Sequence, residues 1–151
     1  MNTLNTTISI LLFIIFLSLS AIHFYWGFGG RRLSDGVLPT KLGETTPTVM
    51  PGKIPTFIVA IGLLCFGLFY LVKAEIISLL LPSWLDRYGL WFIAGIFIFR
   101  AIGDFRYVGF FKKIKQTKFG MKDSKYYSPL CLMIGILTLI ILRVCLNFVF
   151  G

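Results

Sequence analysis

Residues 8–28 read ISILLFIIFLSLSAIHFYWGF and contain no Asp, Glu, Lys or Arg. An apolar helix of about 20 residues is long enough to cross the hydrocarbon core of a bilayer. Similar runs occupy residues 54–72 and 128–150, and a fourth run, residues 88–111, carries several charges within its length. The sequence therefore predicts an all-α fold, in which residues 1–151 form a single four-helix transmembrane bundle.

The overall composition agrees with this reading of the apolar runs. Of the 151 residues, 57% are hydrophobic and 14% are charged, and the mean hydropathy is +0.87. An average soluble domain is about 45 to 50% apolar and about 25% charged. The composition therefore excludes a soluble globular protein and an intrinsically disordered one.

The first run has a second interpretation, which is a cleaved signal peptide. Ser18-Leu19-Ser20 resembles a cleavage site with small residues, but the first eight residues contain no Lys or Arg to form a basic leader. We therefore expect the first run to be a retained membrane span.

The distribution of basic residues predicts the orientation. Ten Lys and Arg lie in residues 29–53 and 112–125, whereas the connection between the second and third runs holds two, Lys73 and Arg87. Because cytoplasmic loops are enriched in Lys and Arg, both termini should lie outside the cytoplasm. The net charge of +9 then favours anionic lipid headgroups as partners. We expect no nucleic-acid partner, and a membrane-protein partner or a homo-oligomer remains open.

Several classes of chemistry lack their usual residues. Cys65, Cys131 and Cys145 form no C-x-x-C pair, which excludes a thiol redox enzyme of that type. The chain contains one His and no acidic cluster, so we expect no metal site. Nucleotide-binding and hydrolase motifs are also missing from the sequence, and we expect no cofactor.

The third run contains three charged residues that are costly to place in a membrane. Arg100, Asp104 and Arg106 each cost about 2.5 to 3.5 kcal/mol on insertion scales, and such residues often mark a functional site. In a continuous helix Arg100, Asp104 and Tyr107 share one face, and Arg100 and Asp104 are one turn apart and can pair. Arg106 points elsewhere and can reach a lipid phosphate at the interface.

A histidine in the first run matches Asp104 in depth. His23 and Asp104 each precede a basic residue, Arg31 and Lys112, by eight residues, which is about 12 Å of helix. If the first and third helices are neighbours, His23 and Asp104 can meet. The predicted binding site contains His23, Trp26, Arg100, Asp104 and Tyr107, with Arg106 as a further phosphate partner. The alternative is a structural Arg100–Asp104 ion pair, with His23 donating to a carbonyl.

Several motifs along the chain resemble those of a known family. They are residues 23–30 (HFYWGFGG), 51–52 (PG), 100–112 (RAIGDFRYVGFFK), 117–120 (TKFG), Asp123 and residues 126–131 (YYSPLC). Together they resemble a family of small bacterial four-helix membrane proteins that is catalogued only as a domain of unknown function. The resemblance implies a multi-pass protein of the bacterial plasma membrane and implies no activity.

Two classes of function fit these residues. The first is a non-enzymatic protein that binds an anionic amphiphile or lipid headgroup in a cytoplasm-facing pocket, as a carrier, lipid-handling protein or accessory subunit. The alternative is a membrane-embedded enzyme that uses His23 and Asp104 for acid–base chemistry on a hydrophobic substrate, or a proton-coupled transporter. Because Arg100 would keep Asp104 ionised, we favour the binding protein over the enzyme.

Overall fold

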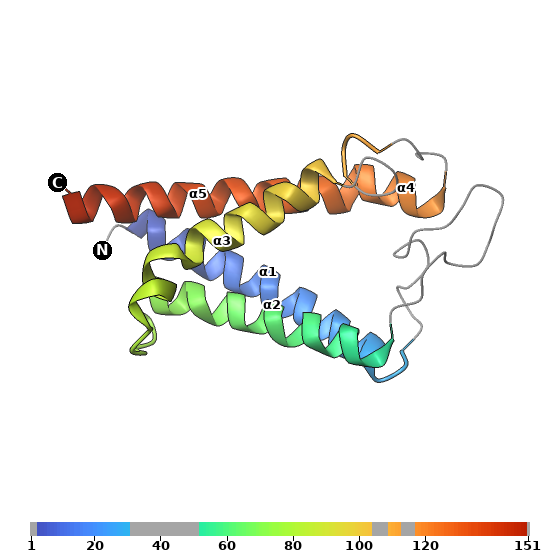
Figure 1. Ribbon diagram of the computed structural model, residues 1–151, viewed down its shortest axis with the longest axis horizontal. Coiled ribbons are helices and arrows are strands. Elements are labelled where there is room, and N and C mark those ends of the chain that lie inside the picture. Colours follow the sequence, from blue (N-terminus) through green and yellow to red (C-terminus); the bar gives the residue numbers. More distant parts are fainter. Residues whose placement is uncertain (1–2, 31–51, 104–108, 113–116, 151) are drawn as a thin grey trace. The chain divides into compact units, whose positions relative to one another are not determined.

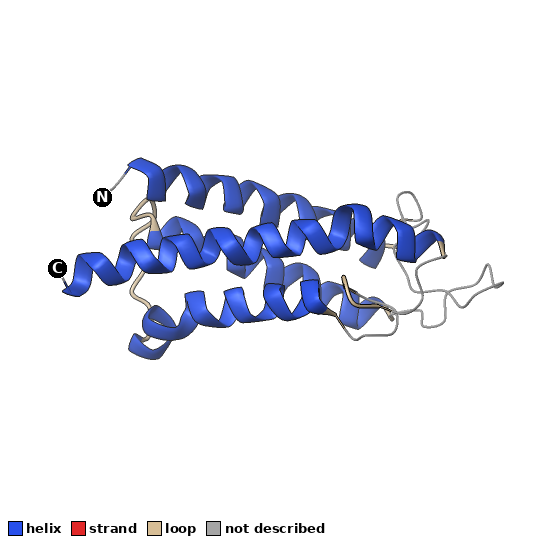
Figure 2. Cartoon of the chain, turned by 90° about the horizontal axis from the view of Figure 1, so that it is seen from above, coloured by secondary structure: helices blue, strands red, loops and turns tan. Residues whose placement is uncertain are grey.

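The computed structural model describes residues 3–30, 52–103, 109–112 and 117–150 (Figure 1). All regular structure in these ranges is helical (Figure 2). The elements are α1 (Thr3–Gly27), α2 (Lys53–Lys73), α3 (Ser83–Ile102), α4 (Lys118–Lys122), the π-helix η1 (Asp123–Tyr127) and α5 (Ser128–Phe150). Because α4, η1 and α5 follow one another without a break, the chain has four long helical segments. The predicted all-α fold with four helices is confirmed.

Three of these segments are long and apolar enough to cross a membrane. They are Thr3–Gly27, Lys53–Lys73 and Phe119–Leu146, with mean hydropathies of 2.3, 2.3 and 2.5. Helix α3 has 20 residues, which corresponds to about 30 Å and matches the hydrocarbon thickness. It carries three charged residues, Asp86, Arg87 and Arg100.

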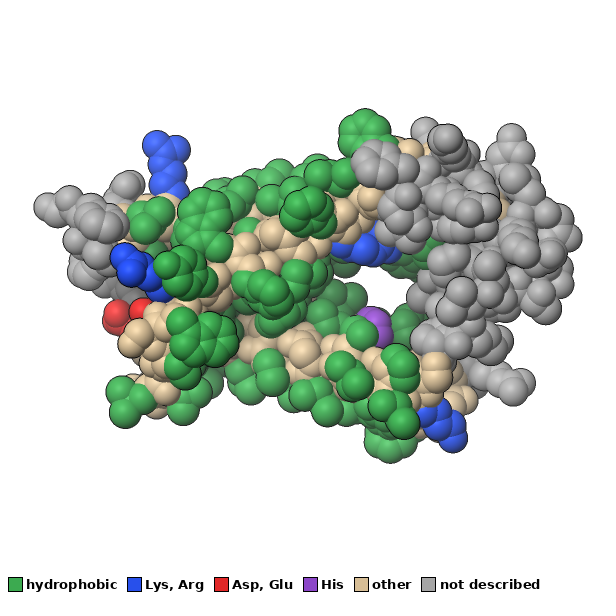
Figure 3. All heavy atoms as spheres, viewed as in Figure 1, with side chains coloured by type: hydrophobic (Ala, Val, Ile, Leu, Met, Phe, Trp, Pro, Cys, Tyr) green, Lys and Arg blue, Asp and Glu red, His purple; other side chains and the backbone are tan. Residues whose placement is uncertain are grey.

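Many of the outward-facing side chains of these helices are large and hydrophobic (Figure 3). On α1, Leu12 and Phe16 are fully buried, whereas Ile14 and Leu17 are 53% and 44% exposed. Exposed hydroxyl groups on the same helix are satisfied locally, since Ser18 Oγ donates to the Ile14 carbonyl at 2.8 Å. Such back-bonding hides polar groups where no water is present. The surface of α1 therefore suits contact with lipid.

The chain divides into two compact units. The first contains residues 1–30, 52–93 and 137–151, and the second contains residues 31–51 and 94–136. The single-domain organisation over residues 1–151 stays a prediction.

Helices α1 and α2 pack side by side in the first unit. A Cβ atom on Gly67 would lie 3.2 Å from Phe16 Cβ, and Ser20 Oγ donates to the Ala60 carbonyl at 2.7 Å. The later residue on α1, Ser20, contacts the earlier residue on α2, Ala60. The two helices are therefore antiparallel. Gly67 lets the helices approach closely, since it has no side chain to separate them.

Polar side chains fasten α2 to other parts of the same unit. Tyr70 Oη and Thr138 Oγ1, both fully buried, form a hydrogen bond of 2.6 Å. At the C-terminal end of α2, Lys73 Nζ donates to Asp86 Oδ1 at 2.6 Å and to the Asp86 carbonyl at 2.7 Å. These contacts connect α2 to α5 and to the first turn of α3.

The third helix ends earlier than the apolar run does. The sequence predicts a helix over residues 88–111, but α3 covers Ser83–Ile102. Gly103 has a φ of 89°, which is a left-handed conformation that ends helices. The chain then returns, because the Phe110 N–H donates to the Ala101 carbonyl at 2.9 Å. The prediction that this helix continues to residue 111 is therefore wrong.

The fourth long segment also differs from its prediction in one respect. Helix α5 begins at Ser128 as expected. Ser128 is not the first helical residue of this segment, however, because α4 and η1 directly precede it. Ser128 has helical φ and ψ angles of −66° and −44°, whereas an N-cap residue has extended angles. The N-cap of the continuous segment is Thr117, whose side chain accepts a hydrogen bond from the Gly120 N–H at 3.0 Å.

Candidate functional site

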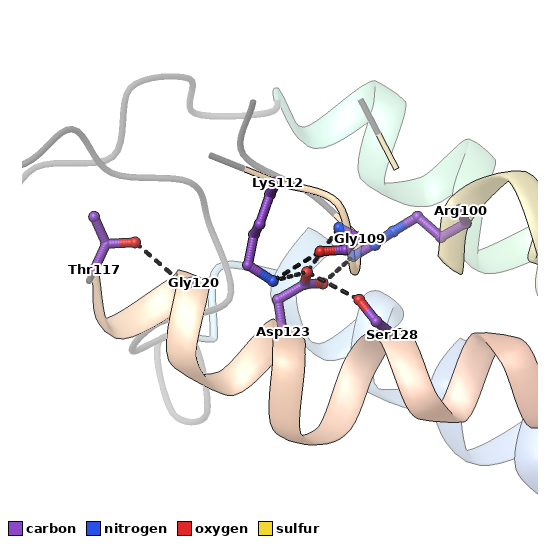
Figure 4. Close-up of polar contacts among 7 residues, drawn as sticks. All are labelled: Arg100, Gly109, Lys112, Thr117, Gly120, Asp123 and Ser128. Atoms are coloured by element: carbon purple, nitrogen blue, oxygen red, sulfur yellow. Dashed lines mark hydrogen bonds and ion pairs between the residues drawn. The ribbon is translucent and has the colours of Figure 1, made fainter. Parts of the chain in front are cut away.

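A buried carboxylate, Asp123, lies where the helical segment changes from α to π geometry (Figure 4). The Ser128 N–H donates to the Asp123 carbonyl, five residues earlier, which is the π-type hydrogen bond. In an α-helix two residues five apart would point about 140° away from each other. The wider π turn instead lets the Ser128 hydroxyl donate to Asp123 Oδ2 at 3.0 Å. Single π turns of this kind often occur at functional sites.

Four donors surround the Asp123 carboxylate, and they come from three parts of the second unit. Oδ1 accepts from Arg100 Nη2 at 2.9 Å. Oδ2 accepts from Lys112 Nζ at 2.7 Å, the Gly109 N–H at 2.9 Å and the Ser128 hydroxyl. We call these five residues the Asp123 cluster. The carboxylate thereby joins the last turn of α3, the segment 109–112 and the start of α5.

The Asp123 cluster contains one more positive charge than negative charge. Lys112 is fully buried and donates to the Gly109 carbonyl at 3.0 Å as well as to Asp123. Arg100 provides the second cation, and Asp123 is the one acidic residue in the cluster. A buried or half-buried charge without a counter-charge is costly. The cluster therefore favours an anion that would neutralise it.

Arg100 is the charged member of the cluster whose side chain is partly exposed. Its side chain is 34% exposed, whereas those of Lys112 and Asp123 are fully buried. Its nitrogen Nη1 is buried and has no hydrogen-bond partner among the described residues. A guanidinium donates along several directions in one plane and binds carboxylate or phosphate oxygens well. Arg100 therefore holds Asp123 with Nη2, while Nη1 is a buried donor that still needs an acceptor.

The structure places some of the residues predicted for the site. Arg100 lies in the second unit, at the Asp123 cluster, and its partner there is Asp123. His23 and Trp26 lie in the first unit. Their expected meeting with residues of the third helix stays a prediction. Three further predicted residues lie outside the described ranges, namely Asp104, Arg106 and Tyr107.

His23 makes the local contact that a structural histidine makes. Its Nδ1 lies 2.8 Å from the Leu19 carbonyl, one turn earlier on α1. Because a carbonyl only accepts, Nδ1 carries the proton in this contact. The ring also packs edge-on against Trp26, with the ring centroids 5.2 Å apart. This contact matches the alternative in which His23 donates to a carbonyl, and any acid–base role stays a prediction.

Lys112 and Asp123 were not among the predicted site residues. The sequence contains a signal that could have identified Asp123, since it is the one acidic residue after Asp104 and stands in a segment rich in lysine. Lys112 carries no comparable signal, because it is one of six lysines between residues 112 and 125. Its burial follows from the turn at Gly109, which brings the segment 109–112 back to the end of α3.

Comparison with known proteins gives a family and no activity. Neither the curated proteins nor the solved structures contain a significant match to this chain. A family model with the description "Protein of unknown function (DUF3995)" matches residues 16–138. The matched region includes all five residues of the Asp123 cluster. The chain therefore belongs to the DUF3995 family of proteins of unknown function.

Proposed function

We propose that this protein spans a bacterial plasma membrane four times and binds an anionic amphiphile through the Asp123 cluster. The observation that carries the proposal is the charge of the cluster, in which two cations share one carboxylate. Its exposed member, Arg100, has a buried nitrogen with no partner among the described residues. In this proposal the protein is a carrier, a lipid-handling protein or an accessory subunit.

The membrane part of the proposal rests on the helices. Three helical segments have the length and hydropathy of membrane spans, and α3 has the length of a fourth. The basic residues support an orientation with both termini outside the cytoplasm. Lys73, one of the two basic residues on the proposed outer side, is neutralised by Asp86 at 2.6 Å. The proposed cytoplasmic side then carries nearly all of the loop charge.

The proposed binding uses the position of Arg100 in α3. Arg100 lies in the last turn of the helix, which in this orientation is the cytoplasmic end. Phosphate groups of the inner leaflet lie at this depth, and arginine binds them through paired hydrogen bonds. The proposed ligand is therefore reached from the lipid and not from the aqueous phase.

The orientation can be tested with fusions to an enzyme that is active only outside the cytoplasm. We expect a fusion after Gly151 to be active, because the loops predicted to be cytoplasmic hold ten of the twelve basic residues outside the runs. A fusion after Thr117, in a predicted cytoplasmic loop, should be inactive. The reverse pattern of activity would show that the orientation is wrong.

Binding can be tested by native mass spectrometry of the protein released from its membrane. We expect Arg100→Gln to lose a copurifying anionic lipid, because the substitution removes the one half-exposed cation of the cluster. The matched control is Lys125→Gln, which removes an exposed cation of η1, two residues after Asp123. Such a lysine contributes about 1 kcal/mol of diffuse attraction.

The comparison of the two variants decides the proposal. Retention of the lipid by Lys125→Gln and its loss from Arg100→Gln would support a specific site. Equal losses would indicate a nonspecific basic surface. Unchanged lipid content in both variants would leave the Asp123 cluster with a structural role only.

A further inference from the structure

The charge of the Asp123 cluster also limits which anion it can accept. Arg100 and Lys112 contribute two positive charges and Asp123 contributes one negative charge. Among the described residues the excess is a single positive charge. Because each uncompensated charge in a poorly solvated site is costly, the best ligand carries one negative charge and no more.

The hydrogen bonds of the cluster lead to the same conclusion. Both oxygens of Asp123 are occupied, and Lys112 Nζ already bonds to Asp123 and to the Gly109 carbonyl. Among the donors that the described part of the cluster provides, Arg100 Nη1 is buried and has no partner. One guanidinium nitrogen can satisfy one or two anionic oxygens, which matches a phosphodiester with its two unbridged oxygens. A phosphomonoester would bring a second negative charge, and the described residues of the cluster supply no further cation to balance it.

From this charge and donor count we infer that the ligand of the Asp123 cluster is the phosphodiester of a singly charged phospholipid headgroup. This inference rests on the proposed binding function and specifies its ligand. A headgroup such as that of phosphatidylglycerol has one net negative charge. Phosphatidic acid is a monoester with a second ionisable proton, and it approaches two charges at pH 8, because the second pKa of a phosphate monoester is about 6 in phosphorylated side chains. Phosphatidylethanolamine has no net charge.

The test compares lipids that share the same acyl chains and differ in headgroup charge. The full-length protein is placed in nanodiscs with equal amounts of phosphatidylglycerol, phosphatidic acid and phosphatidylethanolamine at pH 8, released, and analysed by native mass spectrometry. We expect wild type to retain phosphatidylglycerol about tenfold over each of the others, which corresponds to about 1.4 kcal/mol. Arg100→Gln should abolish this preference, and Lys125→Gln should leave it intact.

A second variant covers the case in which Arg100→Gln does not fold. Arg100→Lys keeps the charge that pairs with Asp123 but has only one nitrogen, so it should fold and lose most of the preference. Millimolar inorganic phosphate in a parallel sample tests a free anion as the ligand. Displacement of phosphatidylglycerol by that phosphate would overturn the assignment to a headgroup.

The remaining outcomes separate this inference from the proposed function. Retention of phosphatidic acid at or above the level of phosphatidylglycerol, with dependence on Arg100, would overturn the inference and leave the proposed function standing. If no lipid depends on Arg100 in either variant, both the inference and the proposed function are wrong.

Discussion

Replacing Asp123 by Asn should lower the free energy of unfolding by about 3 to 5 kcal/mol, the usual cost of removing one partner of a buried ion pair. The substitution leaves Arg100 and Lys112 without their shared counter-charge. It also places an amide N–H₂ group among donors, because three donors converge on Oδ2. Unfolding by SDS in mixed detergent micelles would measure the change.

Asp86→Asn is the matched control for this substitution. Asp86 also pairs with a lysine, Lys73, at 2.6 Å, but its side chain is 62% exposed. An exposed ion pair contributes about 0.2 to 1 kcal/mol, so the control should unfold close to wild type. If Asp123→Asn and Asp86→Asn unfold at the same SDS fraction, the carboxylate of Asp123 does not hold the cluster together.

Gly109→Ala should lower the free energy of unfolding by about 2 to 4 kcal/mol. Gly109 has a φ of 88°, a conformation that costs an L-residue about 1 to 2 kcal/mol. A Cβ atom there would also meet the Ile102 carbonyl oxygen and lie 2.5 Å from Gly103 Cα. Both are backbone atoms, so the segment must move, and such shifts typically cost about 1 to 3 kcal/mol. The same SDS titration would measure the effect.

Gly95→Ala provides the control within α3. A Cβ atom at Gly95 meets no atom within 4 Å, and alanine is favoured over glycine in a helix by about 1 kcal/mol. Gly95→Ala should therefore be neutral or stabilising. A Gly109→Ala protein as stable as Gly95→Ala would show that the turn at Gly109 can relax without cost.

The sequence predicted the helices well where composition alone determines them. The runs at 8–28 and 54–72 correspond to α1 and α2 within a few residues, because an uncharged apolar run of that length has few alternatives to a helix. The third run was predicted too long. Residues 103–111 still include five aromatic or aliphatic side chains beside Asp104 and Arg106, so hydropathy alone does not reveal the turn at Gly103 and Gly109, where φ is 89° and 88°.

The site was predicted less completely, because its main contact joins residues far apart in the chain. Spacing along one helix suggested Asp104 as the partner of Arg100, and the structure pairs Arg100 with Asp123, 23 residues away. That pairing depends on the end of α3 and on the π turn at Asp123–Tyr127. Neither feature follows from helical periodicity, which assumes about 3.6 residues per turn throughout.

The separation of Arg100 from Asp123 also affects the order of events during biosynthesis. At about 5 to 20 residues per second, Asp123 leaves the ribosome about 1 to 5 seconds after Arg100. If α3 spans the membrane as proposed, it would reach the translocon in this interval with its guanidinium not yet paired to Asp123, at an insertion cost of about 2.5 to 3.5 kcal/mol. Release of α3 into the lipid would then be favoured once the segment carrying Asp123 has been synthesised, so that the two helices would enter the bilayer as a pair.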